Sequence, residues 1–278
     1  MRNTVTESAE QPASSDSATT TTDAPVTRAE YCAIAVADAF AGDGEFIASA
    51  FGTIPAIGVR LARLTVAPDL LLTDGEARFV SGSWQIGADP HATEGVVVEG
   101  WSPFRTIFDL VWHGKRHVMM IPTQIDGHGN TNISAIGDYA RPKVQLVGVR
   151  GAPGNSVCHP TSYWVPNHSA RVFVPAVDMV SGVGTDNARA AGPAASAYHA
   201  LRRVVTNLAV LDFGGPDGAM RLLSLHPGVT LEQFRAATGC DVHVEGEVPA
   251  TREPSAEELR LIREVIDPRS LRDREIPG

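Results

Sequence analysis

The acidic turn in PDLLLTDGEARF, residues 68–79, is the first place where the sequence could do chemistry. A run of leucines leads there into Asp74, Gly75 and Glu76. Buried strands of α/β enzymes commonly end in such turns, which place a carboxylate in the crevice along the carboxyl edge of the sheet. A carboxylate in that crevice can act as a base or a nucleophile. The same residues also suit a solvated turn, so the segment alone leaves both interpretations open.

A second segment, QIDGHGNTNIS at 124–134, concentrates amide groups around two glycines. It follows an apolar run and brings Gln124, Asn130 and Asn132 into one short stretch. Amides donate and accept hydrogen bonds, and glycines let the backbone approach a ligand closely. These three residues are therefore candidates for binding a substrate. The alternative is an Asx-type turn, in which the amides bond to their own backbone.

The third segment, GVRGAPGN at 148–155, is rich in glycine and also follows an apolar run. Free backbone N–H groups in such a loop can hold an oxyanion or a phosphate. The candidate binding residues here are Arg150, Gly151, Gly154 and Asn155. A surface turn without a ligand is the alternative interpretation.

Common catalytic and metal-binding signatures are absent from the sequence. It has no phosphate-binding P-loop, no GxGxxG after a strand and no GxSxG nucleophile motif. His113 and His117 stand four apart, but the glutamate of the HExxH zinc motif is missing between them. The cysteines Cys32, Cys158 and Cys240 fit neither a disulfide framework nor a CxxC metal site. We therefore expect no metal and a reducing, cytoplasmic environment.

Composition and charge are those of an ordinary globular chain. Of the 278 residues, 43% are hydrophobic and 20% are charged, which allows a large core. The net charge is −9 and no lysine or arginine cluster exceeds two adjacent residues, which argues against a nucleic-acid partner. No apolar run reaches the ~18 residues of a membrane span. Residues 1–26 are polar and lack an apolar core, and we expect this tail to be disordered.

The elements that must position these segments alternate between short strands and amphipathic helices. A capping box of Thr27 and Glu30 predicts a helix that ends near Ala41. The rest of the first half predicts strands at 45–51, 68–74 and 117–126 and helices at 53–65 and 102–114. Such alternation is typical of an open, mostly parallel sheet with flanking helices, which is an α/β fold.

The second half is richer in strands than the first. We expect strands at 143–151, 170–180, 203–213 and 219–225. Some of them should pair antiparallel, which would make the sheet mixed. Capped helices should follow at 230–239, behind Thr230, and at 255–266, behind Ser255. No linker or repeat interrupts residues 27–278, which we expect to form one domain.

Taken in this order, the segments resemble the β subunit of the class I coenzyme A transferases. PDLLLTDGEA stands where those subunits carry a catalytic glutamate followed by Ser-Gly or Asn-Gly. QIDGHGNTNIS, GVRGAPGN and LHPGVTLEQFRAATG resemble their amide-rich segment, their coenzyme A loop and their C-terminal signature, and the match covers about 27–278. The resemblance implies a parallel-rich α/β fold and an active site between an α and a β subunit, usually in an α2β2 assembly.

The catalytic glutamate of the transferases is replaced in this chain. Asp74 stands at the aligned position, and Gly75 follows it. Asp reaches ~1.5 Å less far than Glu, and a misplacement of this size can cost on the order of 100-fold when a nucleophile must be positioned. Glu76 is no obvious substitute, because it lies two residues farther along the strand.

A closer resemblance accounts for the replacement. GNTNISAIGDYARP, HPTSYWVPNH and IDPRSLRDREI are similar to the β subunit of the actinobacterial cholesterol ring-cleaving hydrolases, a family described as lacking this glutamate. The resemblance implies hydrolysis of a carbon–carbon bond in the last steroid ring, carried as the coenzyme A thioester of a 6-oxocyclohexene carboxylic acid. Coenzyme A would then be part of the substrate, with no separate cofactor, and the main base would come from the α subunit.

The resemblance also implies roles for the candidate residues of this chain. The amide-rich and glycine-rich segments would bind the substrate, with Asp74 and Glu76 at the mouth of the pocket. One alternative is a coenzyme A transferase that uses Asp74, and another is an accessory subunit that only stabilises its partner.

Two further stretches invite a functional interpretation. His159, Tyr163 and His168 are additional site candidates, although the Tyr-Trp pair between the histidines is more typical of a core. The Gly-rich segment 81–101 holds apolar residues of the kind that a partner subunit would cover.

Overall fold

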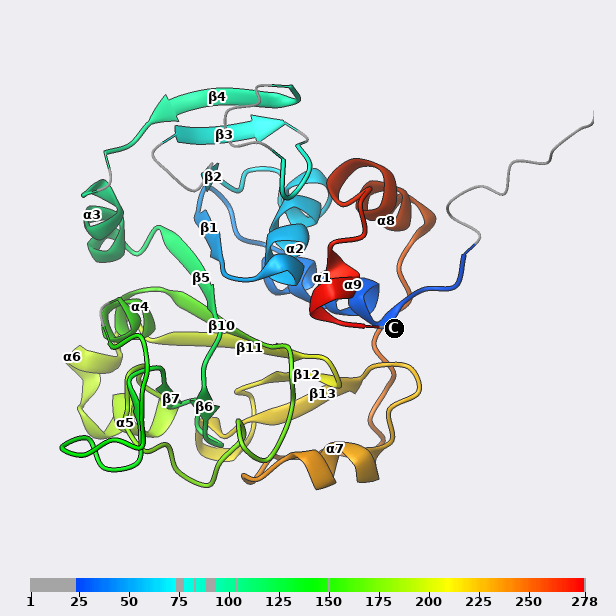
Figure 1. The fold of residues 1–278 in the computed structure, drawn as a ribbon. Coiled ribbons are helices and arrows are strands. Elements are labelled where there is room, and N and C mark those ends of the chain that lie inside the picture. Colours follow the sequence, from blue (N-terminus) through cyan, green and yellow to red (C-terminus); the bar gives the residue numbers. More distant parts are fainter. Residues whose placement is uncertain are drawn as a thin grey trace, which may run out of the picture.

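A mixed sheet forms the centre of the molecule (Figure 1). The computed structural model describes residues 24–73, 78–82, 84–88, 94–103, 105–149 and 151–277. Within these residues the main sheet has six strands, in the order β1-β5-β10-β11-β12-β13. The first four run parallel, and the last two add an antiparallel hairpin. Their bounds are Ile47–Ala50, Arg116–Met120, Pro160–Val165, Ala200–Thr206, Ala209–Asp212 and Arg221–Leu225. The predicted mixed, mostly parallel α/β fold is confirmed.

One face of the sheet is covered by helices from both ends of the chain (Figure 1). The capping box of Thr27 and Glu30 is formed as predicted, and it begins the first of these helices. Their apolar sides enclose a core that includes Ile34, Phe40 and Trp164. The helices are α1 Arg28–Ala39, α2 Thr53–Leu64, α8 Ala256–Arg260, its π-helical continuation η3 Leu261–Ile266, and α9 Arg272–Glu275.

The opposite face is covered by shorter helices and by strand pairs (Figure 1). Because side chains alternate along a strand, Val118 enters this second core while Met119 enters the first. Tyr163 and Phe173 are its largest fully buried members. The elements on this side are α4 Ala152–Cys158, α5 Thr185–Ala190, α6 Pro193–Ser196, α7 Leu231–Ala237, β6 Gln124–Ile125, β7 Thr131–Asn132, β8 Ala135–Ile136 and β9 Val144–Gln145.

A separate small sheet extends from the edge of the main one (Figure 1). It joins β2 Leu72–Thr73, β3 Arg78–Gly82 and β4 Val96–Trp101, and α3 Thr106–His113 follows it. The strand predicted at 68–74 is therefore reduced to its last residues. The segment 81–101, which we expected to be a loop, begins and ends in strands. Alternating apolar residues explain the error, because Val96, Val98 and Phe79 suit a hairpin as well as a partner-covered loop.

Two of the predicted second-half strands are largely absent. Among the described residues of 143–151 only β9 is a strand. The stretch 170–180, which the structure describes in full, makes a single bridge between Phe173 and Ile125. This stretch runs over the sheet face and exchanges only two backbone hydrogen bonds with Ile125. Pro175 follows at once and lacks the N–H that a longer ladder needs.

Local turn chemistry explains two further differences. The predicted strand at 203–213 is a hairpin, because the Thr206 hydroxyl accepts hydrogen bonds from the backbone N–H groups of Leu208 (3.0 Å) and Ala209 (2.9 Å) and closes a turn. The predicted glycine-rich loop ends in α4, where Pro153 occupies the first turn, a position that proline favours. The capping boxes behind Thr230 and Ser255 form as predicted.

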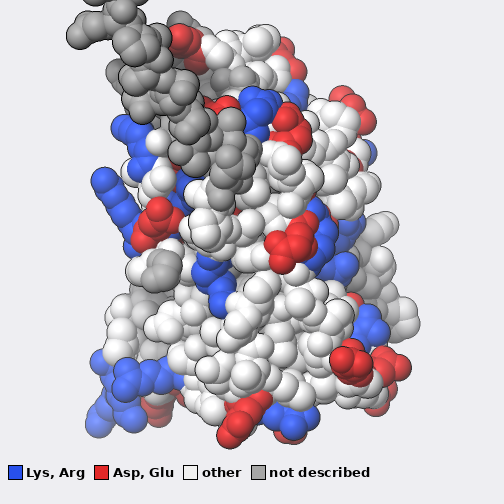
Figure 2. All heavy atoms as spheres, turned by 90° about the vertical axis from the view of Figure 1, so that its right-hand side faces the viewer, with Lys and Arg blue, Asp and Glu red and all other residues white. Residues whose placement is uncertain are grey.

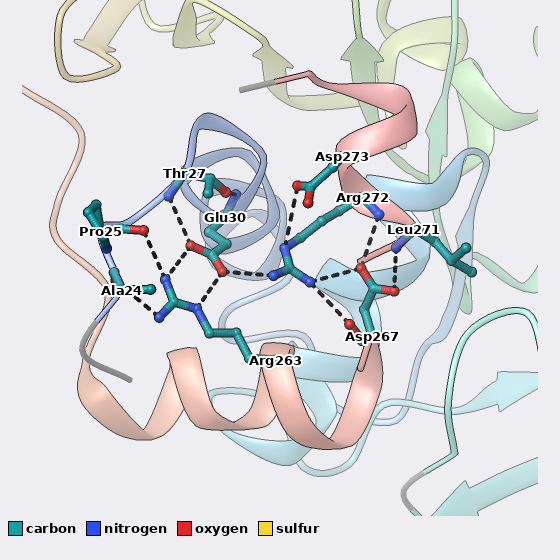
Figure 3. A network of polar contacts seen from close by, with 9 residues as sticks. All are labelled: Ala24, Pro25, Thr27, Glu30, Arg263, Asp267, Leu271, Arg272 and Asp273. Carbon is teal, nitrogen blue, oxygen red and sulfur yellow. Dashed lines mark hydrogen bonds and ion pairs between the residues drawn. The ribbon is translucent and has the colours of Figure 1, made fainter. Parts of the chain in front are cut away.

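A buried ion network joins the first helix to the C-terminal segment (Figure 3). Glu30 is fully buried and accepts hydrogen bonds from Arg263 at 2.7 and 2.8 Å. It also pairs with Arg272 at 3.2 Å, and Arg272 reaches Asp267 at 3.0 Å. The guanidinium groups of Arg263 and Arg272 therefore each face a carboxylate of the same chain.

The surface on the C-terminal side carries charges of both signs. Figure 2 shows basic and acidic side chains in small, interspersed groups on this face. In the part of the chain that the structure describes, no helix is both long enough and apolar enough to cross a bilayer.

Candidate functional site

The predicted binding segments meet at the carboxyl edge of β5. The segment 121–136 leaves the end of this strand, and helix α4 leads into the neighbouring strand β10. The Asn155 amide nitrogen lies 3.8 Å from the sulfur of Met120, the last residue of β5. The N–H of Gly148 also bonds to the carbonyl of Ile133 at 3.1 Å. Two segments predicted separately thus form one site.

Gln124 and Asn132 face each other across the short β6–β7 pair. The Asn132 amide donates to the Gln124 side-chain oxygen at 2.7 Å and to the Ala135 carbonyl at 2.7 Å. The Asn132 oxygen accepts from the N–H of Ser134 at 2.9 Å. Gln124 in turn donates to Asp178 at 3.2 Å. These amides therefore fix the loops of the edge to one another, as in the Asx-turn alternative.

Asn130 is bonded at all four of its side-chain positions. Its amide nitrogen donates to Asp126 at 3.0 Å and to Asp186 at 2.9 Å. Its oxygen accepts from the N–H of Gly184 at 2.7 Å and from Asn187 at 2.8 Å. A Cβ at Gly184 would lie 2.6 Å from the backbone nitrogen of Asn130, so only glycine allows this approach. Asn130 thus clamps the loop before α5 onto the edge.

The first turn of α4 presents the glycines of the third segment. Gly151 is exposed, Gly154 is half-buried and Asn155 is buried. A Cβ at Gly151 would lie 3.5 Å from the Asn155 amide nitrogen, which places this amide under the start of the helix. Arg150 lies outside the described residues, as do Asp74 and Glu76 of the acidic turn.

Arg116 is a residue of this edge that the sequence did not indicate. It begins β5, is 8% exposed, and donates to the hydroxyl of Ser49 at 2.9 Å and to the side-chain oxygen of Asn155 at 3.3 Å. Both acceptors are neutral, and within the described residues no carboxylate pairs with this guanidinium. Burial lowers the pKa of Arg116 from its usual value.

His159 lies beside Arg116 at the end of α4. It is fully buried, and within the described residues neither ring nitrogen makes a hydrogen bond of good geometry, although the ring lies near the backbone of Arg116. Burial, reinforced by the positive charge of Arg116, lowers its pKa to about 4. The ring is therefore neutral at pH 7 and adds no second positive charge beside Arg116.

A Ser-His-Asp array lies on the other face of the sheet. His117 bonds to Asp43 at 2.6 Å and to Ser162 at 2.9 Å, and Arg202 donates to Asp43 at 2.7 Å. The order is that of a hydrolytic triad. His117 and Ser162 are fully buried and Asp43 nearly so, and the Phe40 ring lies 4.2 Å from the histidine ring. Because no substrate can reach this serine, the array serves to join the end of α1 to β5 and β10.

The remaining candidates belong to the core. Tyr163 is fully buried, as the core interpretation of the Tyr-Trp pair predicts. His168 stacks on Phe173 with 3.9 Å between ring centroids, and burial lowers its pKa to about 3. In the described part of the chain, no group of three His, Cys, Asp or Glu side chains is arranged to hold a metal ion.

Comparison with known proteins identifies the family. No protein-family model matches the chain. It is 57% identical over 251 residues to the cholesterol ring-cleaving hydrolase IpdB subunit of Rhodococcus jostii, a match that covers 90% of this chain and 96% of the relative. The chain belongs to the IpdB family.

Solved structures agree with this assignment. The crystal structure of IpdAB from Rhodococcus jostii superimposes with a TM-score of 0.85 at 56% identity, and covers 92% of this chain and 100% of that one. Glutaconate coenzyme A-transferase from Acidaminococcus fermentans gives a TM-score of 0.72 at 23% identity over 87% of this chain and 95% of the other, which shows the shared fold alone. The IpdB family thus has the class I coenzyme A transferase fold.

Exposed apolar side chains surround the edge in this IpdB-family chain. Phe51 follows β1 and is 51% exposed, and Val147, just before α4, is 86% exposed. Others at the same edge are Ile121, Val149 and Val180. Apolar side chains grouped in this way around polar residues are typical of a surface that a partner covers.

Proposed function

We propose that this chain is the β subunit of a hydrolase that opens the last steroid ring, carried as a coenzyme A thioester of a 6-oxocyclohexene carboxylic acid. The observation that carries the proposal is the 57% identity to an IpdB subunit along almost its whole length. The reaction cleaves a carbon–carbon bond, as a lyase does, and needs no cofactor beyond the coenzyme A of the substrate. We place the enzyme in the cytoplasm.

The chemistry requires a base and groups that stabilise negative charge. Water adds to the ring ketone and loses a proton to the base. The bond to the neighbouring ring carbon then breaks, and its electron pair passes to the carbon beside the thioester, which takes up a proton. The former ketone carbon becomes a carboxylate. Donors aimed at the developing oxyanions lower the barrier of both steps.

This edge is suited to hold anions rather than to provide the base. Burial raises the pKa of Asp126, but its oxygens already accept from Asn130 and from the N–H of His128. Asp178 likewise accepts from Gln124 and from the N–H of Gly137. These carboxylates are committed to the scaffold, which supports an α-subunit origin for the main base.

The substrate-binding roles that we propose are supported by the positions of the predicted residues. Gly151, Gly154 and Asn155 lie where a thioester at the edge would contact them, whereas Gln124, Asn130 and Asn132 hold the loops around that place. Arg150, Asp74 and Glu76 complete the proposed set.

An α subunit would cover the apolar side chains around the edge. The exposed Val97 and Trp101 of β4, 57% and 71% exposed, extend this apolar surface along the small sheet. An α2β2 assembly, the usual one of the resembling transferases, would bury both regions and bring the α-subunit base to the edge.

The test is to co-purify the chain with the α subunit and to follow ring opening by mass spectrometry. We expect activity from the complex and none from this chain alone, because the base is missing from it. Full activity of the isolated chain would contradict the two-subunit assignment.

A second experiment separates hydrolysis from coenzyme A transfer. A transferase forms a thioester on its own carboxylate, which borohydride reduces and peptide mass analysis locates. We expect Asp74 and Glu76 to remain unmodified, and Asp74→Asn to keep most of the ring-opening activity. Borohydride reduction at either residue would instead support a transferase.

A further inference from the structure

The guanidinium of Arg116 points toward the proposed site although the residue begins its strand. Ser49 pairs with Val118 in the sheet, two positions nearer the carboxyl edge than Arg116. The Arg116 Nε nevertheless bonds to Ser49, and Nη1 bonds to Asn155 in the second turn of α4. The side chain therefore extends toward the carboxyl ends of the strands and ends at Asn155 of α4.

Among the described residues, no negatively charged group balances this guanidinium. Its hydrogen bonds to described residues go to one hydroxyl and one amide oxygen, and its second terminal nitrogen, Nη2, makes none. A buried charge without a counterion costs several kcal/mol, so such an arginine is normally paired. Another desolvated arginine, Arg60, differs in that it lies over the Trp84 ring, 4.6 Å from its centroid, and bonds to the Ala56 carbonyl.

We propose that Arg116 is an oxyanion-binding residue that holds the carboxylate formed when the ring ketone is hydrolysed. This inference rests on the proposed function and assigns that site a residue for the reacting end of the substrate. Nη2 would donate to an oxygen of the hydrated ketone, and the bond would strengthen as that carbon becomes a carboxylate. Arginine suits this role because its fixed fork matches a planar carboxylate.

The depth of Arg116 favours the reacting end of the substrate over the phosphates of coenzyme A. Arg116 is only 8% exposed, so a ligand group must enter the protein surface to contact its guanidinium. The small ring of the substrate could enter the protein in this way. The phosphates of coenzyme A are hydrated and sit on a long chain, so an open surface would bind them more easily.

The test uses the assembled complex with Arg116→Gln, Arg116→Lys and, as a matched control, Arg60→Gln. Ring opening is followed by mass spectrometry, and inhibition is measured with the ring-opened product and with free coenzyme A as separate probes. We expect Arg116→Gln to lower kcat on the order of 100-fold, as the loss of one oxyanion donor does, and to weaken product inhibition at least ~10-fold. The kcat of Arg116→Lys should lie between the values of the wild type and of Arg116→Gln. Arg60→Gln should match the wild type in both kcat and product inhibition.

Four outcomes would contradict the assignment in different ways. Unchanged kcat and product inhibition would give Arg116 a purely structural role. Weaker inhibition by free coenzyme A alone would place a phosphate on it. If neither Arg116 variant assembled with the α subunit, the counterion of Arg116 would be a carboxylate of that subunit and not the substrate. A wild-type complex that leaves the ring intact would contradict the proposed function itself, whereas a fully active Arg116→Gln complex would contradict only this inference.

Discussion

Two regions of the molecule bury arginine side chains in opposite ways. In the network of Figure 3, Glu30 receives both Arg263 and Arg272, and Asp267 receives Arg272 again. At the carboxyl edge, Arg116 meets only neutral oxygens among the described residues. Both regions are buried and both contain guanidinium groups. They differ in whether the chain itself provides the negative charge.

The difference separates a structural from a functional use of the same side chain. A buried pair that is complete joins elements distant in the sequence, here the first helix and the C-terminal helices. A buried charge without a partner of opposite sign destabilises the free chain, and it favours binding of a ligand or subunit that carries an anion. Proteins retain such costly arrangements mainly at functional sites. The incomplete region coincides with the site derived from the sequence.

The largest effect should come from breaking the complete network. Glu30→Gln leaves Arg263 without a buried carboxylate, and we expect the free energy of unfolding to fall by about 3–5 kcal/mol. Urea unfolding of the assembled complex measures this change. Asp38→Asn is the matched control, because Asp38 pairs with Arg252 at a half-exposed site and should contribute less than about 1 kcal/mol. Equal effects of the two changes would remove the distinction between the regions.

A carboxylate introduced beside Arg116 should raise the stability of the protein and lower its activity. Asn155→Asp places a carboxylate at the 3.3 Å contact with Arg116 and imitates the network of Figure 3. We expect stability to rise by up to about 1 kcal/mol while ring opening falls on the order of 100-fold, because the arginine no longer needs the substrate anion. Asn155→Ser is the control, because it removes the amide without adding a negative charge. If Asn155→Asp kept full activity, Arg116 would not be an anion-binding residue.

A change in pH, rather than in sequence, should also alter the stability of the protein. His159 and His226 both have pKa values lowered to about 4 by burial, but only His159 owes part of this to Arg116. Because the unfolded chain binds these protons near pH 6.5, stability should fall as the pH drops from about 6.5 to about 4, by up to about 1.4 kcal/mol per pH unit and histidine.

Removing Arg116 should change only one of these two histidines. In Arg116→Met we expect the pKa of His159 to rise toward its usual value and that of His226 to stay unchanged, as read by NMR titration. An unchanged His159 would mean that the charge of Arg116 is already compensated.

Sequence reasoning predicted what local signals determine. The capping boxes at Thr27, Thr230 and Ser255 correctly predicted the starts of three helices. The pairing of Arg116 with Asn155 joins residues 39 positions apart, and that of His117 with Asp43 spans 74. Such pairs depend on strand order and register, which no local pattern encodes.

The same limit applies to the amides of residues 124–132. Gln124, Asn130 and Asn132 are what a ligand site needs, but they are also what loops need when they must bond to one another without regular strands. Only the positions of Asp178, Asp186 and Gly184, far along the chain, show that these amides are occupied within the protein.

The most direct test of the account is ring opening by the assembled complex in water labelled with oxygen-18. Hydrolysis bonds a water oxygen to the former ketone carbon, so the account predicts one labelled oxygen in the new carboxylate and an intact coenzyme A thioester. Mass spectrometry of the product measures both. Transfer of coenzyme A to an added carboxylic acid, with the ring intact and no label incorporated, would contradict the claim that this chain works in a ring-opening hydrolase.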